Sequence, residues 1–246
     1  MFKRRIYIEN NLDPFPISRT KIDLFFECRR CFYLDLKFGI KRPHGTPLVI
    51  NNRIIEQIKK EFDFFREKNV VHPEILNLKR NLIPIKHDKL IEWKNSFKGI
   101  RYIEKKTNLQ LYGTIDDLWL DTENNKKICV IYKSTSKKDA LDITNIWPGY
   151  WKQLSFYSYL LKKNNVDISY NGLILYINAS NEIDSQNSEL KFDFYLFEKI
   201  LDFSWIEKTI YEIYELLNKK NIPDLNEKCK FCNYFKNIKN KIDETS

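Results

Sequence analysis

The sequence predicts a single α/β domain in which a mixed β-sheet is flanked by helices on both faces. Segments with the alternation of strands are interspersed with segments of helical periodicity. Hydrophobic residues make up 43% of the chain, which is enough for a substantial core. Only 6 glycines and 8 prolines occur in 246 residues, so long flexible linkers are not expected. We therefore predict one domain over residues 1–246, with its core at about 50–200.

Two helices are predicted in the first third of the chain. Ser18 can cap the first, which runs towards Cys28. Its apolar face is formed by Ile22, Phe25 and Phe26. The second covers residues 52–68, with an apolar stripe of Ile54, Ile58, Phe62 and Phe65. Glu61 projects from the apolar side of this helix, where a carboxylate needs a partner. A basic residue in a structural salt bridge is one such partner.

Four strands and two further helices are predicted downstream of a less periodic stretch at residues 69–108, which is expected to hold loops and short helices. The predicted strands are 109–121, 127–134, 170–178 and 190–197. The predicted helices are 150–163, and a last long helix that Ser204 caps and that ends near Pro223. Because a hairpin and two later strands are interspersed with helices, a mixed sheet is expected.

The net charge of +9 favours a polyanionic partner, with nucleic acid before an anionic membrane. A lysine-rich composition that reflects a biased genome would explain the same charge. No run of about 18 apolar residues is present, so we expect no membrane span. The first residues, Met1 to Arg5, lead into no apolar segment of a secretory signal, and we expect a cytoplasmic protein.

Two Cys-x-x-Cys pairs lie near opposite ends of the chain: Cys28 with Cys31, and Cys229 with Cys232. Two such pairs can supply a four-thiolate metal site that joins segments 18–35 and 223–235. Four unrelated small residues would be the alternative, although the second pair lies in a polar segment. Spacing alone does not separate zinc from an iron–sulfur cluster, but paired Cys-x-x-Cys motifs favour zinc. Cys129, in a predicted strand, is expected in the core.

A possible site is predicted around the first hairpin. Asp116 lies in the segment Gly-Thr-Ile-Asp, and Lys133 lies on the following strand. Gln153 and Tyr157 are four residues apart on the next predicted helix, so they share one of its faces. We expect Asp116 and Lys133 to meet across the hairpin under this helix. The alternatives are an acid in a turn or facing solvent, an exposed lysine, and ordinary helix residues.

These motifs, in this order, resemble the RecB and Cas4 branch of the PD-(D/E)XK nuclease superfamily. That branch has Gly-x-x-Asp, a strand ending in carboxylate-x-Lys, and Gln-x-x-x-Tyr. It also has an N-terminal Cys-x-Arg followed by Phe-Tyr, seen here between Cys28 and Tyr33, and a C-terminal cysteine group. The resemblance extends from about Ser18 to Cys232 and implies a restriction-endonuclease-like fold. Each motif is short, and their order and spacing make the match specific.

The resemblance implies roles for the residues of the hairpin and helices. Asp116 would bind Mg²⁺ or Mn²⁺, with Glu61 and the carbonyl of Tyr132 as further metal ligands. Lys133 would orient the attacking water and offset developing phosphate charge. Gln153 and Tyr157 would position DNA and the lysine. The cysteines Cys28, Cys31, Cys229 and Cys232 would hold a [4Fe–4S] cluster.

The sequence departs from the family pattern at two places. The carboxylate expected two residues before Lys133 is Ile131, which shares a strand face with the lysine. The metal site would therefore lose one of its two main carboxylates. Glu61, Asp117 or the carbonyl of Tyr132 would have to replace this ligand, although the side chain of Asp117 should face away from that of Asp116. The third cysteine usual in the tail is absent, and a four-ligand set needs Cys31.

The predicted function is a metal-dependent, exonuclease-like hydrolase of single-stranded DNA or duplex ends. The alternative from another class is a catalytically inactive nucleic-acid-binding or scaffold module, which Ile131 favours. A zinc protein unrelated to nucleases is a third possibility. Basic residues that would contact phosphates, or simply form a solvated face, are Arg29, Arg30, Lys137, Lys138 and Lys152.

Overall fold

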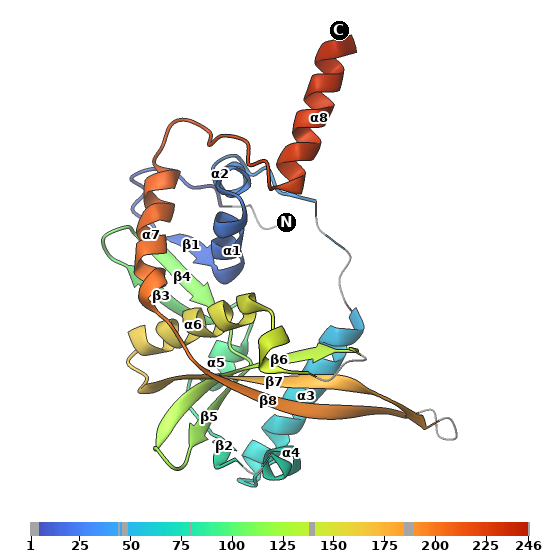
Figure 1. Cartoon of the computed structure of the whole chain (residues 1–246). Helices are drawn as coiled ribbons and strands as arrows, with labels where there is room; N and C mark the ends of the chain where they lie inside the picture. Colours follow the sequence, from blue (N-terminus) through green and yellow to red (C-terminus); the bar gives the residue numbers. More distant parts are fainter. Residues whose placement is uncertain are drawn as a thin grey trace. The chain divides into compact units, whose positions relative to one another are not determined.

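The computed structural model describes residues 5–43, 45, 49–78, 80–137, 141–184 and 189–245 (Figure 1). The chain divides into two compact units. We call residues 1–46, 103–112 and 204–246 the cysteine unit, and residues 47–102 and 113–203 the sheet unit. The single domain expected from the sequence stays a prediction.

A five-stranded mixed sheet forms the centre of the sheet unit, in the order β2-β5-β6-β7-β8. The strands β5–β6 and β7–β8 are antiparallel neighbours, whereas β6 and β7 run parallel. The predicted mixed sheet is therefore confirmed. The strand bounds are Leu82–Pro84 (β2), Asp117–Asp121 (β5), Lys126–Thr135 (β6), Ile168–Asp184 (β7) and Glu189–Ile200 (β8).

Helices α3 (Val49–Glu67) and α6 (Pro148–Lys163) cover opposite faces of this sheet (Figure 1). On α3, Ile58 and Phe62 pack into a buried cluster with residues of one strand face, namely Trp119, Ile128, Val130, Tyr132, Leu173, Leu175 and Ile177. Side chains alternate along a strand, so Lys133 points to the other face, where it contacts α6. Strand β6 thus presents Ile128, Val130 and Tyr132 to α3 and Lys133 to α6.

The predicted single strand 109–121 is wrong, because the chain leaves the ladder between β4 (Leu109–Gly113) and β5. Strand β4 belongs instead to a three-stranded sheet, β1-β4-β3, with β1 at Phe15–Ser18 and β3 at Ile100–Glu104. The break has a physical cause. The backbone N–H of Tyr132 on β6 donates to the carboxylate of Asp116, so it is not available to pair with the backbone of a neighbouring strand. The short helices of the predicted loop region are α4 (Pro73–Asn77) and α5 (Leu90–Lys94), and a 3₁₀ turn at Ile143–Asn145 precedes α6.

The helices of the cysteine unit are α1 (Arg19–Glu27), α2 (Arg29–Phe38), α7 (Ser204–Leu217) and α8 (Lys230–Thr245). Helix α1 confirms the first predicted helix, and the chain turns at Cys28 into α2. Helix α7 ends at Leu217, so the prediction that the last helix runs to Pro223 is wrong. Helix α8 was not predicted, because Cys232 is the only buried residue among the described residues of this helix and the segment as a whole is polar, so it has no continuous apolar stripe.

The helices of the described residues are short or polar compared with a membrane span. The longest is α3, with 19 residues that include several charged side chains. Within the described ranges, none combines the length and the apolar character needed to cross a bilayer.

Candidate active site and metal centre

A cavity of about 460 Å³ opens in the sheet unit beside the end of β6. Polar side chains from α3, from the β4–β5 connection, from β6 and from α6 line it. These are Asn51, Asn52, Glu56, Lys59, Thr114, Asp116, Lys133, Ser134 and Gln153, together with the aromatic residues Tyr132, Tyr150 and Tyr157. Five of the residues singled out in the sequence therefore meet in one pocket: Asp116, Tyr132, Lys133, Gln153 and Tyr157.

Asp116 lines this pocket, and both of its carboxylate oxygens have partners. Oδ2 accepts the backbone N–H of Tyr132 at 2.9 Å, and Oδ1 lies 2.5 Å from Nζ of Lys59. A residue in a strand directs its N–H and C=O to the same edge, so the carbonyl of Tyr132 faces the edge where Asp116 lies. Two hard oxygen donors of the kind that Mg²⁺ or Mn²⁺ prefers are thus next to each other.

Lys133 is held by a chain of hydrogen bonds from α6. Its Nζ donates to Oε1 of Gln153 at 3.0 Å, and Nε2 of Gln153 donates to the hydroxyl of Tyr157 at 3.2 Å. The ammonium also lies 4.5 Å from the ring centroid of Tyr150. These contacts hold the amine of Lys133 in the pocket, beside the ring of Tyr150.

Gly113, the glycine of the Gly-x-x-Asp motif, is required by the close approach of Tyr157. A Cβ at Gly113 would lie 2.5 Å from Cε1 of the tyrosine ring, closer than atoms can pack. The motif glycine therefore lets α6 contact the chain three residues before Asp116. The two motifs support each other sterically.

Ile131 is completely buried on the face of β6 that also carries Lys133. Strand β5 begins with Asp117 paired to Val130, which places Asp116 at the level of Ile131. An apolar side chain therefore lies next to Asp116 where a second carboxylate was expected.

Glu61 lies away from the pocket. Its Oε1 is 3.2 Å from Nε2 of His72, and the described residues that line the pocket do not include it. The backbone N–H of Glu74 donates to Nδ1 of His72, so the proton of the neutral imidazole lies on Nε2. Burial lowers the pKa of His72, which favours this neutral form. The contact between Glu61 and His72 corresponds to the structural role that was the alternative for Glu61 in the sequence analysis.

The acid that α3 does present to the pocket is Glu56, which sequence reasoning missed. Its side chain is 58% exposed and pairs with Arg53 at 3.3 Å. Glu56 lies three residues before Lys59 and four after Asn52, so all three occupy one face of α3. The spacing of Asn52, Glu56 and Lys59 was the signal in the sequence that could have identified this polar face of α3. The prediction followed the apolar stripe of the helix instead.

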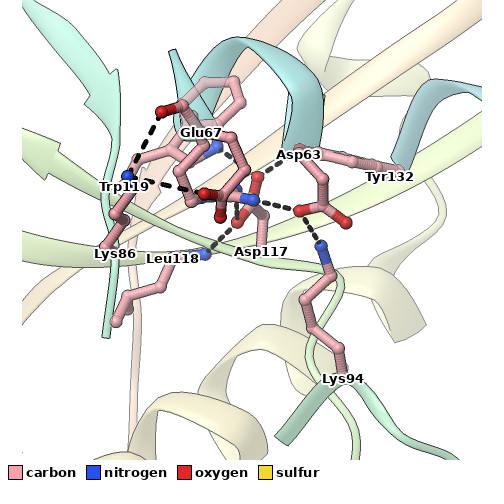
Figure 2. Close-up of polar contacts among 9 residues, drawn as sticks. Asp63, Glu67, Lys86, Lys94, Asp117, Leu118, Trp119 and Tyr132 are labelled. Carbon is pink, nitrogen blue, oxygen red and sulfur yellow. Dashed lines mark hydrogen bonds and ion pairs between the residues drawn. The ribbon is translucent and has the colours of Figure 1, made fainter. Parts of the chain in front are cut away.

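Asp117 points away from the pocket into a buried polar network, as strand alternation predicts (Figure 2). Its carboxylate accepts the Trp119 indole N–H at 2.9 Å and the Tyr132 hydroxyl at 2.6 Å, and it pairs with the buried guanidinium of Arg66. Burial, and then the charge of Asp117, raise the pKa of Tyr132, so its hydroxyl stays a donor. Asp63 extends the network by pairing with Arg66 and, at 2.6 Å, with Lys94.

The four cysteines converge in the cysteine unit as a separate buried cluster. Their sulfurs all lie within 4.8 Å of one another. The Sγ atoms of Cys28 and Cys232 are 3.6 Å apart, those of Cys31 and Cys229 3.7 Å, and those of Cys31 and Cys232 3.9 Å. The predicted joining of the N-terminal and C-terminal segments by four cysteines is confirmed, and this donor set can hold a metal.

The surroundings of the cysteines favour thiolates at some positions more than at others. Burial raises the pKa of the Cys31 thiol to about 12. Burial alone would also raise the pKa of Cys229, but hydrogen bonds from the backbone of Cys232 and Phe231 lower it to about 7. Arg42 donates to Sγ of Cys229 at 3.1 Å and places a positive charge beside the cluster. A bound cation would offset the rest of the thiolate charge.

The arginines expected at phosphates have partners within the cysteine unit. Arg29 pairs with Glu212 at 2.7 Å, and Arg30 donates to the carbonyl of Pro223 at 2.8 Å. Lys138, also expected at phosphates, lies outside the described residues. The basic residues that line the pocket are Lys59 and Lys133.

The mixed sheet, its two covering helices and the acid–lysine pocket define a nuclease-like α/β fold. The chain belongs to the PD-(D/E)XK nuclease superfamily, because the model of that superfamily matches residues 49–236. Among solved structures, the chain is similar to the protein of "Crystal structure of SSO0001", with 16% sequence identity and a TM-score of 0.32, over 93% of this chain and 86% of that one. A search of curated proteins finds no match.

Proposed function

We propose that this chain is a metal-dependent DNA nuclease of the RecB- and Cas4-like type. The observation that carries the proposal is the single pocket that unites Asp116 with the chain Lys133–Gln153–Tyr157. Superfamily membership supports phosphodiester hydrolysis as the reaction class. The order of the motifs supports the RecB- and Cas4-like branch, and the net charge of +9 supports a nucleic-acid partner.

Asp116, the carbonyl of Tyr132 and Glu56 are the oxygen donors that would hold Mg²⁺ or Mn²⁺. Such an ion supplies Lewis-acid activation of water and of the scissile phosphate. Lys59 lies at 2.5 Å from Asp116, so its ammonium has to move from Oδ1 when an ion binds. Glu61 is replaced in this proposal by Glu56, because Glu56 lines the pocket.

Lys133 would donate a hydrogen bond to the attacking water or to a phosphate oxygen as charge develops there. Gln153 keeps the ammonium in place, and Tyr157 orients the amide of Gln153. The side-chain amides of Asn51 and Asn52 reach the same pocket and can donate to phosphate oxygens. We propose single-stranded DNA or duplex ends as the substrate.

Alanine at Asp116 or at Lys133 is expected to lower Mn²⁺-dependent cleavage of labelled single-stranded DNA by about 100-fold or more, since each removes a group that stabilises the transition state. Matched controls lie at the other end of the same two strands, where Asp121 pairs in register with Lys126. Asp121→Ala and Lys126→Ala should cleave like the parent chain. Equal activity of Asp116→Ala and Asp121→Ala would refute the proposed site.

The two glutamates of α3 should differ in their effect. Glu56→Gln is expected to weaken Mn²⁺ binding by about tenfold or more, because it removes a charged oxygen donor from the pocket. Glu61→Gln should leave Mn²⁺ binding unchanged, because Glu61 contacts His72 instead. Titration of Mn²⁺ followed by electron paramagnetic resonance measures both. A larger loss in Glu61→Gln would reverse the assignment.

A second function, nucleic-acid binding without cleavage, is favoured by two specific observations. Ile131 is buried where a second carboxylate would complete the metal site. The ammonium of Lys59 already neutralises Asp116. In this alternative, Lys133 and Lys59 hold the phosphate backbone electrostatically. Binding of labelled DNA that persists in EDTA, without cleavage at any Mn²⁺ or Mg²⁺ concentration, would establish it.

The cysteine site is proposed to have a structural role, because its ligands come from two segments far apart in the sequence. Its donor set is four thiolates, which suits zinc or an iron–sulfur cluster by chemistry alone.

A further inference from the structure

The spacing of the four thiols measures the size of the group that they can hold. Three of the sulfur–sulfur separations are 3.6, 3.7 and 3.9 Å. All separations among the four sulfurs stay within 4.8 Å. Four thiolates about 2.3 Å from one zinc ion in a tetrahedron are separated by about 3.8 Å. The thiols are therefore spaced as ligands of one ion.

A [4Fe–4S] cluster needs a wider arrangement of ligands. Each cysteine binds a different iron at a corner of the cube and lies outside that corner. The sulfurs of the cysteines then enclose the whole cube, and their separations exceed those around a single ion. Here the four cysteines pack against one another, with Leu24 and Phe231 against them, as one buried cluster. This arrangement does not fit the cluster that the family resemblance implies.

The local backbone repeats the same arrangement at both pairs. Cys28 is the N-cap of α2, and Cys31 is its third residue, whose backbone N–H lies 3.4 Å from Sγ of Cys28. Cys229 directly precedes α8, and Cys232 is the third residue of that helix. Helix starts stabilise thiolates through unpaired N–H groups and the helix dipole. Two equivalent pairs thus supply two thiolates each.

We infer that the cysteine site binds a single tetrahedral zinc ion, not a [4Fe–4S] cluster. The inference does not depend on the nuclease proposal, because it concerns only residues of the cysteine unit. The site is closed, with four protein ligands, which is the pattern of structural zinc rather than catalytic zinc. Arg42, which contacts Sγ of Cys229 and pairs with Glu27 at 2.6 Å, offsets the net negative charge of a four-thiolate zinc site.

The test is metal analysis of the full chain, produced and purified without oxygen in medium that supplies iron and zinc, so that an oxygen-sensitive cluster would survive. We expect a colourless protein with one equivalent of zinc and no iron. Exchange with Co²⁺ should give the intense visible absorption of a tetrahedral thiolate site. About four irons per chain with a brown colour would overturn the inference, and so would a protein without stoichiometric metal.

Two cysteine variants provide matched thiol controls. Cys232→Ser removes a proposed ligand and should lose most of the zinc and the thiolate-to-cobalt absorption. Cys129→Ser removes a thiol that is equally buried but belongs to β6 in the sheet unit, and it should keep one equivalent of zinc. Zinc lost equally from both variants would contradict the assignment. The spectrum of the parent chain with Co²⁺ keeps the test decisive if Cys232→Ser fails to fold.

Discussion

Replacing Ile131 with aspartate is expected to raise the affinity for Mn²⁺ by about 10–100-fold and to raise DNA cleavage with it. The new carboxylate would lie at the level of Asp116 and on the face of Lys133, where it would add an oxygen donor to Asp116, the carbonyl of Tyr132 and Glu56. A divalent ion would then compete better with the ammonium of Lys59 for Asp116. Cleavage of labelled single-stranded DNA over a Mn²⁺ series measures the gain.

Thermal unfolding gives a second, independent readout for Ile131→Asp. A carboxylate at this fully buried position destabilises the metal-free chain, and bound Mn²⁺ restores stability because it binds only the folded state. Ile131→Asn, similar in size but uncharged, should show the destabilisation without the rescue. If Mn²⁺ fails to rescue Ile131→Asp and cleavage does not rise, the pocket is not a metal site, and DNA binding without cleavage is the remaining function.

Asp117→Ala is expected to lower the free energy of unfolding by about 3–5 kcal/mol. The substitution leaves the guanidinium of Arg66 buried without its main counter-charge, and it removes the acceptor of the Tyr132 hydroxyl and the Trp119 indole. Because the backbone of Tyr132 holds Asp116, the pocket should loosen as well. Denaturant unfolding followed by tryptophan fluorescence measures the loss, since Trp119 lies inside the network.

An exposed ion pair on the same sheet serves as the control for Asp117. Lys126 and Asp167 are 2.6 Å apart with exposed fractions of 48% and 68%, so Asp167→Ala should cost no more than about 1 kcal/mol. The double variant Arg66→Met with Asp117→Leu should lose less than the sum of the single variants, because no charge is left unpaired. A loss below about 1 kcal/mol for Asp117→Ala would show that the buried guanidinium of Arg66 does not depend on Asp117 for its counter-charge.

The parts of this structure that local sequence patterns predict are those with one dominant physical signal. The β-branched centre of β6 predicted a buried strand, and the spacing of Gln153 and Tyr157 predicted a shared helix face. The cysteine pairs predicted a common site because thiols in a polar segment have few other uses. In each case the residue type and its local neighbours were enough.

The features that escaped prediction depend on contacts across the chain. Lys59 and Glu56 reach the pocket through the orientation of α3, which hydrogen bonds between Asn51 and Ser134 help to set. Arg66, near the end of α3, is the buried partner of Asp117, and no local pattern marks it as such. Periodicity identifies an apolar face, but it does not say which charged residues beside that face are covered.

The ligand set of the cysteine site has a consequence for the order of events during synthesis. Cys28 and Cys232 are separated by 204 positions, so the first pair leaves the ribosome long before the second exists. Every strand of the five-stranded sheet is translated in that interval. The first pair must therefore stay reduced and without its full ligand set while the sheet assembles, and metal loading becomes one of the last steps in maturation.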